Sequence, residues 1–60
     1  MKKRILIIDD EEDICEMMKL NLETTGEFEV TTAYTGEKGV ENVKSGNFDL
    51  WYIIKNYYST

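Results

Sequence analysis

The stretch Lys3-Arg4-Ile5-Leu6-Ile7-Ile8-Asp9-Asp10-Glu11-Glu12-Asp13 decides the fold. Its four consecutive apolar residues, Ile5 to Ile8, follow a basic segment, and such a continuous run is typical of a strand that is buried on both faces. Five consecutive carboxylates come directly after it. A buried strand that ends in polar residues predicts a parallel sheet, because open parallel sheets place ligand sites at the carboxyl ends of their strands.

The segment after the strand is predicted to be a helix from Asp10 to about Thr25, ending at Gly26. Its apolar residues recur at helical spacing on one stripe: Ile14, Met17, Met18 and Leu22. Cys15 lies next to this stripe without a histidine or second cysteine to pair with, so we interpret it as a small, partly buried hydrophobe and not as a redox group.

Two further strands and one further helix are predicted downstream. The strands are residues 28–33, which are rich in β-forming residues, and residues 49–54. Between them a helix opens at Thr35-Gly36-Glu37, points Val40 and Val43 the same way, and ends at Ser45-Gly46-Asn47. The order strand, helix, strand, helix, strand predicts an α/β fold with right-handed crossovers, a parallel sheet and the strand order 2-1-3.

Composition narrows the class of protein. The chain has 60 residues, of which 12 are acidic and 7 basic, giving a net charge of −5. No apolar run is long enough for a membrane span or a signal peptide, which predicts a cytoplasmic protein without membrane contact. Scattered cations disfavour nucleic acid, whose phosphates need a clustered basic face. A domain of this size is marginal unless a partner stabilises it.

The acidic run has two interpretations. Asp9 and Asp10 leave the strand together and can converge on one hard cation such as Mg²⁺, which prefers oxygen ligands. Alternatively, Asp10 is only the N-cap of the helix, with the following acidic residues favoured by the helix dipole. The residues themselves leave both interpretations open, because a cation site needs a third ligand.

The segments 3–14, Ala33-Tyr34-Thr35-Gly36-Glu37 and Gly46-Asn47-Phe48-Asp49-Leu50 together resemble the N-terminal half of a receiver domain from bacterial two-component response regulators. The resemblance implies the βαβαβ half of a flavodoxin-like, doubly wound parallel sheet. It also implies that Asp9 and Asp10 are the Mg²⁺-binding pair and that the ancestral partner is a sensor histidine kinase. The function that it implies is phosphorelay signal transduction, not enzymatic turnover.

The sequence departs from the family where the phosphoacceptor aspartate belongs, because position 54 is Ile54. Asp49 precedes the third strand and is expected at the opposite end of the sheet, so it is a poor substitute. We therefore expect a truncated receiver that does not accept a phosphoryl group and binds Mg²⁺ only weakly. Residues 1–50 form the truncated receiver-like half-domain, and residues 51–60 a divergent third strand and tail.

An alternative function is a self-associating structural half-domain, natural or engineered, without signalling activity. The third strand is apolar and uncharged, and its outer edge lacks a neighbour, which makes it a template for another chain. We expect a homodimer in which two third strands pair antiparallel and complete the sheet. The predicted interface residues are Trp51, Tyr52, Ile53 and Ile54.

Overall fold

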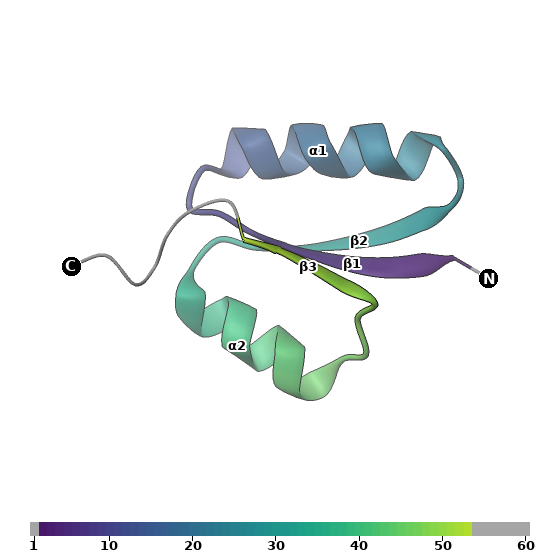
Figure 1. Ribbon diagram of the computed structural model, residues 1–60. Coiled ribbons are helices and arrows are strands. Elements are labelled where there is room, and N and C mark those ends of the chain that lie inside the picture. The colour runs from purple at the N-terminus through teal and green to yellow at the C-terminus, as the bar shows by residue number, and fades with distance from the viewer. Residues whose placement is uncertain (1, 54–60) are drawn as a thin grey trace.

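The computed structural model describes residues 2–53 and contains five elements in the predicted order. They are β1 (Lys3–Ile8), α1 (Glu12–Thr24), β2 (Phe28–Ala33), α2 (Gly36–Ser45) and β3 (Leu50–Ile53). The three strands form one parallel sheet in the order β2-β1-β3, with α1 on one face and α2 on the other (Figure 1). The predicted α/β fold, its parallel sheet and the strand order 2-1-3 are confirmed.

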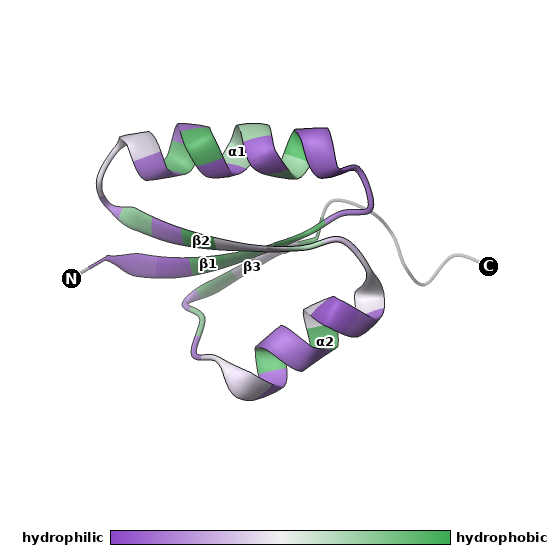
Figure 2. Cartoon of the chain, turned by 180° about the vertical axis from the view of Figure 1, so that it is seen from behind, coloured by the Kyte–Doolittle hydropathy of each residue, from purple (hydrophilic) through white to green (hydrophobic). Residues whose placement is uncertain are grey.

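The central strand β1 supplies most of the core, because it has a neighbouring strand on each side and a helix over each face. Alternate residues of β1 point to opposite faces of the sheet. Towards α1, Ile5, Ile7 and Val30 pack with Cys15, while towards α2, Leu6, Ile8 and Ala33 pack with Val43 and Phe48. Figure 2 shows the matching distribution, with apolar residues along the strands and hydrophilic residues over much of both helices.

Several element boundaries differ slightly from the prediction. Strand β1 begins at Lys3, because the Lys3 N–H donates to the Glu27 carbonyl at 3.0 Å and extends the ladder with β2. Helix α1 begins at Glu12, two residues after the predicted start at Asp10. Gly26 follows α1 with φ of +79°, a left-handed conformation that glycine adopts without steric cost. Ile54, the last residue of the predicted third strand, lies outside the described residues.

The predicted apolar stripe of α1 is partly wrong. Met17 is 57% exposed, whereas Cys15 is fully buried. Met18 and Leu22 follow Cys15 at intervals of three and seven residues and pack with it against β1 and β2. This stripe is therefore centred near Cys15, and Met17 lies roughly on the opposite side of the helix at 100° per residue.

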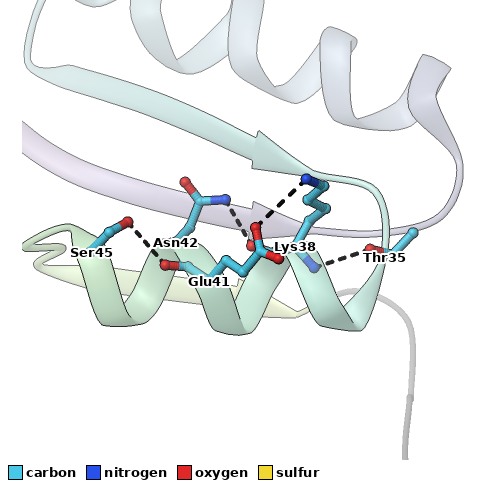
Figure 3. Close-up of polar contacts among 5 residues, drawn as sticks. All are labelled: Thr35, Lys38, Glu41, Asn42 and Ser45. Carbon is cyan, nitrogen blue, oxygen red and sulfur yellow. Dashed lines mark hydrogen bonds and ion pairs between the residues drawn. The ribbon is translucent and has the colours of Figure 1, made fainter.

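Helix α2 has one apolar side and one polar side. Thr35 caps its start by accepting a hydrogen bond from the Lys38 N–H at 3.1 Å. Lys38 pairs with Glu41, and Asn42 and Ser45 donate to backbone carbonyls one turn earlier (Figure 3).

On the apolar side of α2, Val43 packs in the core, but Val40, which the sequence predicts to point the same way, is 54% exposed. Gly39 packs against Ile8 of β1, and Val40, the next residue round the helix, lines an open groove together with Ile53 of β3.

No helix in the described part of the chain is both long and apolar enough to cross a membrane.

Candidate functional site

Asp9 stands at the carboxyl end of β1, where the sequence predicted a ligand site. The Asp9 N–H donates to the Ala33 carbonyl at 3.1 Å and so extends the ladder between β1 and β2 by one residue. The Asp9 residue is only 2% exposed. The sheet therefore fixes the backbone from which this carboxylate projects.

The Asp9 side chain accepts a hydrogen bond within the turn between β1 and α1. Its Oδ1 accepts a hydrogen bond from the Glu11 N–H at 3.1 Å. The alternative that Asp10 is the N-cap of the helix is wrong, because Glu11 holds that position and makes no capping bond with its side chain. Asp9 instead satisfies a backbone donor at the entrance to the helix, where the first N–H groups have no partner inside the helix.

Asp10 is exposed beside Asp9, and Glu12 and Asp13 follow in the first turn of α1. Acidic residues are stabilising at this end of a helix, because the peptide dipoles leave it partly positive. Across residues 2–53, no group of three or more carboxylate or thiol side chains comes together in a way that could hold a metal ion. The carboxylates of Asp9 and Asp10 suit a hard cation chemically, but as a pair they leave most of its coordination shell to water.

Cys15 lies directly beneath this turn. Its thiol contacts the Asp9 carbonyl oxygen at 3.5 Å, and the residue is fully buried. Burial raises the pKa of the Cys15 thiol, and the negative charges of Asp9 and Glu16 raise it further. The thiolate, which is the reactive form, is therefore disfavoured. Cys15 packs as a hydrophobe, as predicted, but it is fully buried and not partly buried.

Asp49 lies at the other end of the sheet, as predicted. Its Oδ2 accepts from the Arg4 N–H at 2.8 Å, and its own N–H donates to the Arg4 carbonyl at 2.8 Å. Arg4 precedes Asp9 by five residues on the same strand, a distance of roughly 16 Å at about 3.3 Å per residue. The carboxylate of Asp49 is thus bound to the start of β1 and cannot approach the acidic pair without breaking these bonds.

The predicted interface residues Trp51, Tyr52 and Ile53 lie on β3 and are 46–55% exposed. Ile54 lies outside the described residues. An open groove of about 650 Å³ runs between β3 and α2, with Ile8, Val40, Val43 and Ile53 as its apolar lining. Sequence reasoning missed this groove. The available signal was Gly39 in the middle of the helix, which marks a close approach of α2 to the sheet.

Comparison with known proteins identifies a relative. The chain is 40% identical over 50 residues, or 83% of its length, to the alkaline phosphatase synthesis transcriptional regulatory protein PhoP of Bacillus subtilis (strain 168). PhoP is a response regulator, and the match covers 20% of its length. No family model and no solved structure matches the chain.

A parallel sheet of order 2-1-3 with acidic residues at the end of its central strand defines the class as flavodoxin-like α/β proteins. Within this class, the chain is a relative of the response regulators and corresponds to the N-terminal half of a receiver domain. The resemblance found in the sequence motifs is confirmed, and it connects the chain with signalling proteins of two-component systems.

Proposed function

We propose that this receiver-derived segment does not accept a phosphoryl group. The observation that carries the proposal is the isoleucine at position 54, where the resemblance places the acceptor aspartate. Phosphoryl transfer onto a receiver needs a nucleophilic carboxylate, and a hydrocarbon side chain has no lone pair with which to attack phosphorus. The sensor kinase that phosphorylates related proteins is then only an ancestral partner of this segment.

The neighbouring carboxylates support the same proposal. Asp49 is the nearest carboxylate before position 54, and its hydrogen bonds to Arg4 hold it at the end of the sheet away from Asp9. Asp9 is buried and accepts the Glu11 N–H, which lowers its availability as a nucleophile. Neither side chain replaces a carboxylate at position 54.

The test is incubation of the chain with acetyl phosphate and Mg²⁺, followed by intact-mass analysis, with the complete receiver domain of PhoP as the positive control. We expect the control to gain the mass of one phosphoryl group and this chain to gain none. A base-labile adduct of that mass on this chain would overturn the proposal.

Three further properties belong to this proposal. Mg²⁺ binds weakly at Asp9 and Asp10, because two adjacent carboxylates without a third leave the ion largely hydrated. The segment works in the cytoplasm, as response regulators do.

The segment does not bind nucleic acid, because the cations of the described residues form no basic cluster. Arg4 pairs with Glu29 at 3.3 Å, and Lys38 pairs with Glu41 at 3.6 Å. Truncation of the receiver stays a prediction, which the coding sequence beyond residue 60 checks.

The second candidate function is that of a self-associating half-domain, and the exposure of β3 favours it. All four residues of β3 are 46–57% exposed, and within residues 2–53 no strand pairs with its outer edge. The strand contains no charge or proline of the kind that protects natural sheet edges. A second copy of the chain would shield it.

Light scattering of the 60-residue chain at about 10 µM tests this candidate, because specific dimers are commonly populated at micromolar concentration. We expect the mass of a dimer for the native chain and loss of the dimer for Ile53→Lys, which places a charge on β3. Asn47→Lys adds the same charge in an exposed loop and should leave the dimer intact. A folded, monodisperse monomer of the native chain would refute self-association.

A further inference from the structure

We infer that two copies pair their β3 strands antiparallel in one particular register, with Tyr52 on the two-fold axis and Trp51 opposite the partner's Ile53. This inference rests on the self-association proposed above and adds its geometry. Three observations carry it: the direction of the backbone groups on β3, the face on which each side chain lies, and the apolar surface that the register brings together.

The backbone of β1 determines which groups of β3 are free. The N–H groups of Lys3 and Asp9 bond to the β2 side, and the Arg4 carbonyl accepts from Asp49 on the β3 side. Because backbone groups alternate along a strand, Leu6 and Ile8 also point towards β3. Of two facing residues in a parallel pair, only one directs its groups at the other strand.

Trp51 faces Leu6 and Ile53 faces Ile8 in the register of β1 with β3. Since Leu6 and Ile8 direct their backbone groups at β3, those of Trp51 and Ile53 point away from β1, towards the outer edge. Each of the two residues offers one donor and one acceptor there. Leu50 and Tyr52 direct their groups inwards.

The faces of the sheet restrict the register further. Leu6 and Ile8 lie on the α2 face, so their register partners Trp51 and Ile53 lie on that face as well. Tyr52 faces Ile7 and lies on the α1 face. A two-fold axis perpendicular to the sheet makes the strands antiparallel and keeps equivalent faces on the same side, so residues that oppose one another must come from the same face.

One register uses all the outward groups of the described strand. When Trp51 opposes the partner's Ile53, both residues exchange their N–H and C=O groups with the partner, and symmetry repeats the pair. Placing Trp51 opposite the partner's Trp51 would bring Ile53 opposite position 49, whose N–H is already bonded to Arg4.

The register also covers apolar surface. On the α2 face, the partner's Trp51 lies beside Ile53, which forms one wall of the groove between β3 and α2. On the α1 face the two Tyr52 rings meet. The side chains that this register brings together, those of Trp51, Tyr52 and Ile53, are 46–55% exposed in each copy. Pairing removes part of this apolar surface from water, which favours association.

Cysteine cross-linking tests the register. In a Cys15→Ala background, first shown by light scattering to be folded and dimeric, Tyr52→Cys places two thiols across the axis. Opposed residues of this kind have Cα atoms about 4.5 Å apart, within the range that a disulfide spans. Trp51→Cys is the matched control, because its two copies are diagonal across the strands, at more than about 7 Å, and should cross-link at least tenfold more slowly.

Mild oxidation should therefore convert Tyr52→Cys to a covalent dimer, and Trp51→Cys should form one rapidly only when mixed with Ile53→Cys. A dimer that cross-links faster through Trp51→Cys alone than through Tyr52→Cys would overturn the register but leave self-association standing. A monomer would overturn both. The acetyl phosphate experiment is independent of each of these outcomes.

The native chain provides a second readout that needs no substitution. In a mixture of isotope-labelled and unlabelled chains, we expect intermolecular nuclear Overhauser effects between the Trp51 indole and the Ile53 methyl groups. Intermolecular effects confined to a contact between the two Trp51 rings would contradict the register.

Discussion

Gly39 packs directly on Ile8: a Cβ built on Gly39 would lie 2.5 Å from Cδ1 and 3.1 Å from Cγ1 of Ile8. The missing side chain allows α2 to approach the end of β1 closely. The helix makes its main contacts with β1 and β2. Gly39 and Ile8 also line the groove beside β3, so this close contact forms part of its floor.

Replacing Gly39 with alanine should destabilise the chain although alanine is the better helix former. The gain in helix propensity is about 1 kcal/mol, whereas forcing an extra methyl group into a packed core costs about 1–3 kcal/mol. We expect the free energy of unfolding to fall by about 1 kcal/mol in urea denaturation. An increase would show that Ile8 moves aside without cost.

The matched control for this substitution is Gly39→Ala combined with Ile8→Val. Valine lacks the Cδ1 atom that the new methyl group would meet, so the loss caused by Gly39→Ala should be smaller in the Ile8→Val background. A double-mutant cycle measures this coupling directly. Equal losses in both backgrounds would place the strain elsewhere.

Most of the fold could be predicted from the sequence, because each element carries its own local signal. The continuous run from Ile5 to Ile8 marked the central strand, and Thr35 and Gly46 marked the ends of α2. The side-chain stripe of α1 was harder to predict. Cys15, a residue with a small side chain, forms its centre, whereas the larger Met17 is exposed, and hydrophobicity alone does not distinguish them.

The candidate site was predictable in position but not in its internal bonds. The topology places Asp9 at the carboxyl end of β1 whatever its neighbours are. That its carboxylate accepts the Glu11 N–H depends on how the turn closes, and the sequence offered Asp10 only as one possible cap of the helix. The groove depends on how α2 lies across the sheet, including the close contact of Gly39 with Ile8, and helix periodicity does not predict that position.

Asp9→Ala should destabilise the chain by about 1 kcal/mol, because it leaves the Glu11 N–H without its acceptor at a helix entrance. Asp9→Asn keeps an acceptor oxygen at the same place and should cost less. Asp13→Ala removes an exposed charge from the first turn of α1 and should cost about 0.5 kcal/mol. Urea denaturation of the three variants checks the order. Equal losses for Asp9→Ala and Asp9→Asn would contradict the role of the hydrogen bond.

Mg²⁺ at about 10 mM should raise the melting temperature only slightly, since a ligand near its dissociation constant adds RT ln 2, about 0.4 kcal/mol. Replacing Asp9 and Asp10 together by asparagine should remove this increment. NaCl at the same ionic strength, without Mg²⁺, provides the control. A micromolar affinity for Mg²⁺ in calorimetry would contradict weak binding and would require a third ligand.

Cys15 should resist thiol reagents until the chain unfolds, because the residue has no exposed surface. Its reaction with a disulfide reagent at pH 8 should therefore be slow in buffer and rapid in urea. Fast reaction in buffer, with the chain still folded by circular dichroism, would contradict the burial.

The raised pKa of Cys15 also gives stability a pH dependence with a definite sign. Burial, the first cause, and the charge of Asp9 raise the thiol pKa in the folded chain above its ordinary value of 9.0. Above pH 9 the unfolded chain therefore binds fewer protons at this residue than the folded chain, so the free energy of unfolding must fall as pH rises.

The substitution Cys15→Ala removes this contribution, while the tyrosines and lysines still titrate. We expect the stability of the native chain to fall more steeply than that of Cys15→Ala between pH 9 and the folded-state pKa, in urea denaturation at several pH values. Parallel curves would mean that Cys15 ionises as easily in the folded chain as in the unfolded one.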